Sequence, residues 1–223
     1  VICTLIQPDG KIIVGGDFHE CNGTNRYNIA RLNPDGSLDA AFEPWPGVPS
    51  RINSMCLQAD GKVVVGGWFT PYEPSSSGIT RLNADGSLDT GFAASVNYTD
   101  EYEDPANVRS IAVQPDGKII IGGTFDHSDG YTRHNIARLN GDGSLDASFD
   151  PGSGNSGSVR SIIVQPNGKI IIAGSFSAYN GVDRMGIVRV NVNGHLVTPF
   201  NSGSGAYDVV AAILQQNGKI IIA

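Results

Sequence analysis

A five-residue turn motif returns through this chain at nearly even spacing. It reads Gln-Pro-Asp-Gly-Lys at residues 114–118, between two apolar runs, and four close variants of it occur elsewhere. The glycines of the five copies lie 50 to 56 residues apart, at Gly10, Gly61, Gly117, Gly168 and Gly218. Proline followed by Asp-Gly favours a type I turn closed by a left-handed glycine, which joins two strands in a tight hairpin. We therefore expect one strand-rich unit, repeated along the chain.

A second motif lies between the copies of the first. It reads Arg-Leu-Asn-Pro-Asp-Gly-Ser-Leu-Asp at residues 31–39 and is followed by Phe42. It recurs at residues 81–92 and 138–149, and in altered form at 189–200. Together the two motifs divide the chain into repeats of about 1–51, 52–107, 108–158 and 159–208, with a partial fifth repeat at 209–223.

Each repeat is expected to contain four short strands, which in the third repeat cover residues 110–114, 118–122, 135–140 and 145–149. These runs are rich in Ile and Val and are bounded by turn residues. Residues 118–121 show no polar alternation after the lysine, which indicates a sheet covered on both faces. Sustained helical periodicity is absent from the sequence.

Four-stranded units of this length, covered on both faces, stack radially as blades. The predicted fold is therefore an all-β β-propeller with four complete repeats and half of a fifth. Half a blade leaves sheet edges uncovered, so we expect this chain to be a segment of a larger ring, part of a longer chain or assembly.

Composition argues against several classes of partner. The formal net charge of −7 and the isoelectric point near 4.9 disfavour nucleic acid, which requires a basic surface, and anionic membranes. No apolar run is long enough to form a membrane-spanning helix, so membrane insertion is not expected. The three cysteines, Cys3, Cys21 and Cys56, lack the spacing of a zinc site, and a Cys3–Cys21 disulfide is left open.

Most charged and aromatic residues recur with the repeat. All eight phenylalanines occupy two repeating positions, and all five lysines directly follow the turn glycine. Nine of the ten arginines also recur, and only Arg51 has no evident counterpart. Residues that return wherever the fold returns are expected to be framework, because a catalytic site needs particular groups at one place.

Residues 33–39 resemble a calcium-binding loop, in which oxygen ligands occupy alternate positions. However, the first ligand position is Arg31, and a guanidinium cannot donate an oxygen to a cation. We interpret the segment as a hairpin whose Asn and Asp side chains brace their own backbone, with Arg31 pairing with Asp39. No metal or cofactor is expected, since no catalytic nucleophile or phosphate-loop motif occurs either.

Two repeat families resemble this chain. The Ile121-Gly122-Gly123 ending is similar to the kelch double-glycine signature. The pattern at residues 28–42 and 135–149, with the Gln-Pro-Asp-Gly-Lys turns, more closely resembles the bacterial delta-sixty repeat. This resemblance covers nearly the whole chain and weakens where Asn193, His195 and Val197 depart from the motif. It implies a large secreted or surface-exposed bacterial protein, and it brings no catalytic residues.

Candidate binding residues are expected in the variable segments, which would share one face of the propeller. All seven tyrosines and both tryptophans fall in or beside these segments. Flat amphipathic rings beside acidic residues suit carbohydrate or extended peptide. The densest group, around the second repeat, consists of Trp45, Trp68, Tyr72, Tyr98 and Tyr102. The alternative is that these rings only fill gaps between blades.

The sequence favours a non-catalytic binding or display module, with carbohydrate or another protein as ligand. The alternative is a propeller-type glycoside hydrolase or lyase acting from the same face. Such an enzyme needs paired acids, and residues 100–104 are the only concentrated source of them. A kelch-like intracellular scaffold is disfavoured by the bacterial repeat pattern.

Overall fold

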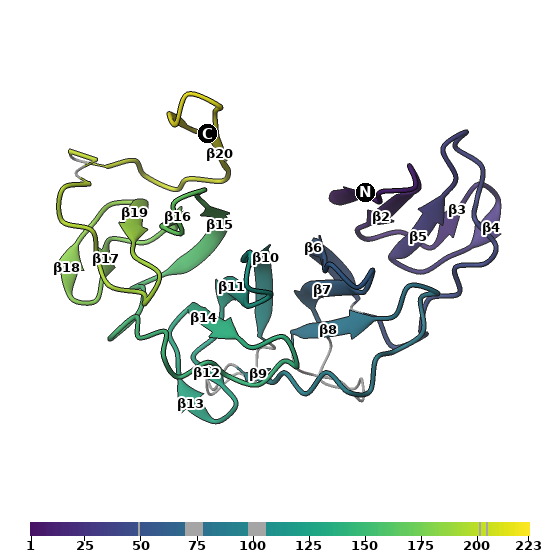
Figure 1. The fold of residues 1–223 in the computed structure, drawn as a ribbon, viewed down its shortest axis with the longest axis horizontal. Coiled ribbons are helices and arrows are strands. Elements are labelled where there is room, and N and C mark those ends of the chain that lie inside the picture. Colours follow the sequence, from purple (N-terminus) through teal and green to yellow (C-terminus); the bar gives the residue numbers. More distant parts are fainter. Residues whose placement is uncertain (49, 70–77, 98–105, 201, 204) are drawn as a thin grey trace.

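The computed structural model describes residues 1–48, 50–69, 78–97, 106–200, 202–203 and 205–223. These residues form strands, turns and loops, without a helix. The sheets are arranged as blades in an open arc, and the two ends of the chain lie on either side of its opening (Figure 1). The predicted all-β β-propeller is confirmed. The expectation of a larger ring remains a prediction.

Each complete blade is a sheet of three antiparallel strands. From the inside of the arc outward, the strands of the four blades and the two strands of the partial blade are β1 (Cys3–Ile6), β2 (Ile12–Gly15) and β5 (Ile29–Leu32); β6 (Arg51–Leu57), β7 (Val63–Trp68) and β8 (Ile79–Leu82); β10 (Asn107–Val113), β11 (Ile119–Thr124) and β14 (Ile136–Leu139); β15 (Ser158–Val164), β16 (Ile170–Ser175) and β19 (Ile187–Val190); β20 (Ala212–Leu214) and β21 (Ile220–Ile222). The inner strand β10 packs beside both β6 and β15, so the first strands of the blades surround the axis.

The motif turns join the first and second strands as expected. In the third blade the backbone N–H of Gly117 donates to the carbonyl of Gln114 at 2.9 Å, and Gly117 has a φ of 83°. A residue with a side chain rarely adopts this left-handed conformation, which explains the glycine at this position.

The hydrophobic cores lie between blades. In β11, Ile119 and Ile121 belong to the core shared with the second blade, while Ile120 belongs to the core shared with the fourth. All three side chains are fully buried. The absence of polar alternation in this strand therefore reflects two covered faces, as predicted.

The fourth strand of each blade is reduced to one bridge. In the third blade this bridge pairs Leu139 with Leu145, and no strand follows it. The outer side is instead occupied by short hairpins from the loop between the second and third strands (Figure 1). These hairpins are β3 (Glu20–Cys21) with β4 (Thr24–Asn25), β12 (His127–Ser128) with β13 (Tyr131–Thr132), and β17 (Ala178–Tyr179) with β18 (Val182–Asp183).

The crossover between blades does not stay on one face. Its first residues contact the next blade's outer turn: the N–H of Trp45 donates to the carbonyl of Gly86 at 2.9 Å. Further along, β9 (Val96–Asn97) pairs with β12 in the hairpin of the following blade. The expectation of a single variable face is therefore wrong for the described residues. The variable segments wrap the outer rim because the shortened fourth strand leaves room there.

Candidate functional site

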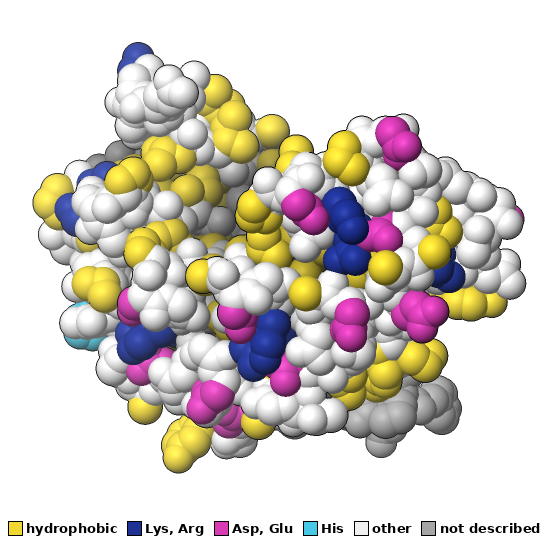
Figure 2. Space-filling view, turned by 45° about the vertical axis from the view of Figure 1, so that its right-hand side comes forward, with side chains coloured by type: hydrophobic (Ala, Val, Ile, Leu, Met, Phe, Trp, Pro, Cys, Tyr) yellow, Lys and Arg dark blue, Asp and Glu magenta, His cyan; other side chains and the backbone are white. Residues whose placement is uncertain are grey.

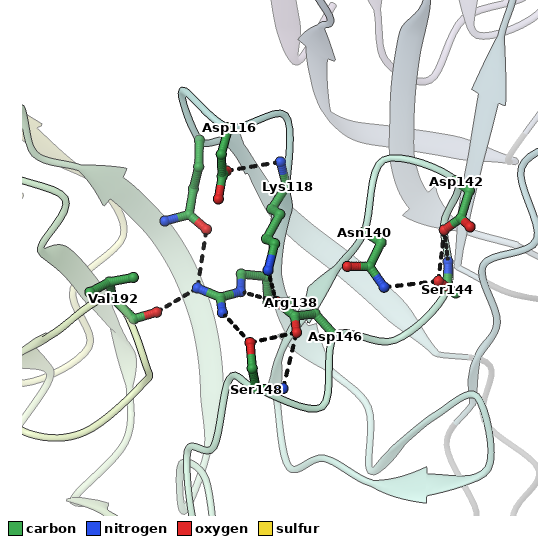
Figure 3. Close-up of polar contacts among 10 residues, drawn as sticks. Asp116, Lys118, Arg138, Asn140, Asp142, Ser144, Asp146, Ser148 and Val192 are labelled. Atoms are coloured by element: carbon green, nitrogen blue, oxygen red, sulfur yellow. Dashed lines mark hydrogen bonds and ion pairs between the residues drawn. The ribbon is translucent and has the colours of Figure 1, made fainter.

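The recurring charged residues connect neighbouring blades. In the third blade, Nε of Arg138 and Nζ of Lys118 both donate to Oδ2 of Asp146, each at 2.7 Å (Figure 3). The Arg138 guanidinium also donates to the carbonyl of Val192 in the fourth blade. The first blade has the same arrangement, so the predicted pairing of Arg31 with Asp39 is confirmed. Cationic and acidic side chains lie next to one another on the face in Figure 2.

The calcium-like motif is occupied by its own hydrogen bonds. Oδ1 of Asp142 accepts from the backbone N–H and the hydroxyl of Ser144, at 3.0 and 2.7 Å, and Nδ2 of Asn140 donates to the same hydroxyl oxygen (Figure 3). The equivalent turns at residues 33–37 and 83–87 repeat this pattern. These contacts support the interpretation as a braced hairpin. Among the described residues, no three His, Cys, Asp or Glu side chains form a metal-binding group.

The buried carboxylates of this framework are held ionised. The Lys11 ammonium, with Arg31, lowers the pKa of Asp39 to about 2, and Lys62 with Arg81 does the same for the pKa of Asp89. Burial alone would raise the pKa of Asp146, but hydrogen bonds from Lys118 and Ser148 outweigh it and lower that pKa. These acids therefore act as fixed anions in the framework.

Trp45 lines a pocket at the outer rim, between the first and second blades. The pocket has a volume of about 250 Å³ and is bounded by residues 25–27 after the first hairpin and by residues 43–48 of the crossover. Tyr27 is 58% exposed, whereas Trp45 is half-buried against the core between the two blades. Asn25, Arg26 and Glu43 add polar groups to the same lining.

Trp45 is held in position by a tight turn. The backbone N–H of Val48 donates to the carbonyl of Trp45 at 3.2 Å, which closes the turn beneath the ring. A Cβ on Gly47 would overlap the indole, so glycine at this position lets the ring lie directly on the backbone. The indole is therefore pre-positioned, which lowers the entropy cost of using it in binding.

Trp68 lies elsewhere, at the end of β7 near the axis. It pairs with Arg51 within its own blade and with Asn107 of the next blade, and it is not among the residues that line the rim pocket. Its side chain is 42% exposed, which confirms that it is not a core residue. The two tryptophans expected to form one site thus belong to two different surfaces.

The remaining predicted aromatic residues, Tyr72, Tyr98 and Tyr102, lie outside the described residues, as do the acids at 100–104. Of the other tyrosines, Tyr131 and Tyr207 are exposed. Tyr179 is fully buried, and its hydroxyl donates to the carbonyl of Gly194 at 2.6 Å. For Tyr179 the alternative interpretation is therefore correct, since it packs a hairpin against its own blade.

A larger cavity, about 650 Å³ in volume, lies between the third and fourth blades. It is lined by Thr124, Asn155, Ser158 and other small or polar residues. Sequence reasoning missed it because it looked for aromatic clusters, and this lining is dominated by Ser, Gly and Asn. The volume lies within the range of small-molecule sites.

The cysteines show no reactive environment. All three are free thiols, so the structure contains no Cys3–Cys21 bridge. Burial raises the pKa of Cys3 to about 11 and also raises the pKa of Cys56. Reactive thiols need the opposite shift, and these two are packed as small apolar groups.

Sequence comparison identifies the family. The family model of a β-propeller domain of unknown function, DUF5122, matches residues 7–42, 58–92, 114–149 and 165–196, which together make up more than half of the chain. The chain belongs to this family. A search of curated protein sequences found no match.

Solved structures from three bacteria share the fold of this DUF5122 protein. The extracellular domain of BT3049 from B. thetaiotaomicron has a TM-score of 0.62 at 16% identity, covering 100% of this chain and 25% of that one. XC5397, a gluconolactonase from Xanthomonas campestris, has a TM-score of 0.61 at 14% identity, with coverages of 99% and 67%. PorZ, a surface component of the type-IX secretion system of Porphyromonas gingivalis, has a TM-score of 0.58 at 12% identity, with coverages of 98% and 30%.

The chain thus spans between a quarter and two thirds of these proteins' lengths. At such low identity, the similarity concerns the fold. No helix in the described part of the chain is long and apolar enough to cross a membrane.

Proposed function

We propose that this chain is a non-catalytic binding module of a secreted or surface-exposed bacterial protein, and that its outer-rim pocket binds carbohydrate. The observation that carries the proposal is the convergence of Tyr27 and Trp45 with Asn25, Arg26 and Glu43 in one pocket. Aromatic faces stack on the apolar side of a sugar ring, while amide and charged groups can bond its hydroxyls. A peptide of another protein is the second ligand class that this lining suits.

The extracellular location rests on resemblance. BT3049 and PorZ are described as an extracellular domain and a surface component. The similarity of the repeat motifs to delta-sixty repeats, with their kelch-like glycine pairs, points the same way. Both are consistent with a display role within a longer surface protein.

The acids of the described residues favour binding over catalysis. Every described carboxyl whose pKa departs from its usual value has that pKa lowered, and Asp39, Asp89 and Asp146 are held by framework cations. A glycosidase needs one carboxyl with a raised pKa to act as the general acid. The gluconolactonase similarity supports only the shared fold.

The proposal can be tested by screening a glycan array with the wild-type chain and the Tyr27→Ala variant. Tyr27 is exposed, so its removal should leave the fold intact while abolishing the glycan signal. Tyr131→Ala is the matched control, because Tyr131 is equally exposed, at 63%, on another blade. Loss of signal in both variants, or no glycan bound by the wild type, would rule out this pocket. Capture of a peptide instead would select the second ligand class.

A further inference from the structure

Three arginines gather where the inner strands begin, around the axis of the propeller. Arg51 opens β6, Arg109 lies near the start of β10, and Arg160 near the start of β15. These strands lie side by side around the axis. Burial, and the neighbouring guanidiniums of Arg160 and Arg51, lower the pKa of Arg109. The three cations are therefore close enough to repel one another.

The strand register explains why the side chains meet there. The pairing of β10 with β11 shifts between Val108 and Ser110, and that of β15 with β16 shifts between Val159 and Ser161. Arg109 and Arg160 are thus the extra residues of two equivalent β-bulges. A bulge turns its extra side chain away from the regular pleat. The same bulge in β6 carries Asn53, so this blade contributes Arg51 from the strand end instead.

The positive charge of this cluster is only partly neutralised. Arg160 pairs with Asp208 at 2.9 Å, but its Nε is buried without a hydrogen-bond partner. Within the described part of the chain, Arg109 and Arg51 have neither a carboxylate nor a hydrogen-bond partner. Three guanidiniums thus share one acid, in a protein whose net charge is −7. Keeping like charges together costs folding free energy, and such an arrangement is typical of a site that binds an anion.

The surroundings suit a sugar rather than a bare anion. Trp68 is the direct cross-strand partner of Arg51 and is exposed, so an aromatic face adjoins the guanidiniums. Ser158, which opens the strand carrying Arg160, also lines the cavity between the third and fourth blades. A flat ring and a polar cavity therefore border the cluster on two sides.

We propose that the axial mouth formed by Arg51, Arg109, Arg160 and Trp68 binds an acidic saccharide. The guanidiniums would hold its carboxylate or sulfate group with charge-assisted hydrogen bonds, while Trp68 stacks on a sugar ring. Uronic acids and sulfated sugars share this chemistry. The site is separate from the rim pocket, and neither proposal depends on the other.

Calorimetric titration of the whole chain with a galacturonic acid trisaccharide and with a sulfated disaccharide would test the proposal. At low salt, at least one of the two should bind, and Arg109→Gln and Arg51→Gln should each weaken its binding about tenfold. Affinity should fall as salt is raised, and a neutral galactose trisaccharide should not bind at this site. Which acidic probe binds more tightly distinguishes carboxylate from sulfate.

Arg184→Gln is the matched control, because it removes the same charge beside the hairpin on the outer rim of the fourth blade and should leave affinity within twofold. An equal loss in this variant would show only nonspecific attraction and would overturn the proposal. Equal affinity for the neutral trisaccharide, or no binding of either acidic probe at millimolar concentration, would do the same. Thermal melting identifies any variant that fails to fold, and Tyr27→Ala should leave this binding unchanged.

Discussion

The hydroxyl oxygen of Ser110 accepts a hydrogen bond from the backbone N–H of Ile162 in the next blade, at 3.0 Å. Ser54 bonds Ile111 and Ser161 bonds Ala212 in the same manner. Each inner strand is thus tied to its neighbour by one serine, at a level where no backbone ladder connects them. This bond joins the inner ends of the blades, while the arginines of the third strands join the outer ends.

Replacing Ser110 with Ala should therefore destabilise the protein by about 1–3 kcal/mol, because the N–H of Ile162 loses its partner in a partly buried position. Chemical denaturation measures the effect. Ser110→Thr keeps the hydroxyl and should lose much less. Equal losses for the two variants would mean that packing, and not the hydrogen bond, is responsible.

The fourth blade lacks the acid of the charged framework, and restoring it should stabilise the fold. Val197 takes the place of Asp39 and its counterparts, with its N–H bonded to the carbonyl of Arg189, and Nε of Arg189 is buried without a partner. Val197→Asp should raise the free energy of unfolding by about 1 kcal/mol through new charge-assisted hydrogen bonds. Val197→Asn is the uncharged control, and the prediction fails if both variants have the same melting temperature.

Acid should weaken the fold through the framework aspartates. The pKa of Asp39 and that of Asp89 are about 2 in the folded chain, against about 3.9 for an unfolded aspartate. A lowered folded pKa contributes stability that is complete above the unfolded pKa and is lost as pH falls through the folded one. Melting temperature should thus drop between about pH 4 and pH 2. Asp39→Asn should show a shallower drop, and an unchanged slope in this variant would contradict the assignment.

Two glycines of the third blade should respond differently to alanine. Gly117 has a positive φ with open space around it, so Gly117→Ala should cost about 1 kcal/mol from backbone strain alone. A Cβ on Gly123 would overlap the carbonyl oxygen of Asn107 across the strand pair, so Gly123→Ala should cost about 3 kcal/mol or more. Thermal melting of both variants compares the two costs, and similar losses would contradict the distinction between strain and overlap.

The repeating parts of this fold were predictable from sequence because their causes are local. A left-handed turn needs Gly117, a close strand crossing needs Gly123, and the pairing of Arg31 with Asp39 follows from their positions across one hairpin. The rim hairpins carried a local signal as well, since Asn22-Gly23 and Asn180-Gly181 have the positive φ angles typical of a tight hairpin turn. That signal was overlooked because these dipeptides were assigned to loops.

The candidate sites were less predictable because they depend on contacts between blades. Trp45 and Trp68 are close in sequence to the same repeat, yet the crossover carries one to the rim and β7 carries the other to the axis. Arg51 had no counterpart in the aligned motifs, because the cluster it joins is set by the bulges that carry Arg109 and Arg160. A bulge shifts register by one residue, and no repeat pattern in the sequence marks it.

The alternation of Ile119, Ile120 and Ile121 between two cores has a consequence for how such proteins change in evolution. A blade cut out on its own would expose both faces of its central strand to water, so we do not expect an isolated repeat to fold. A whole repeat, however, brings one new core for each neighbour it gains. Gain or loss of blades should therefore occur in complete units, while substitutions that alter one face are tolerated only when the adjoining blade changes with them.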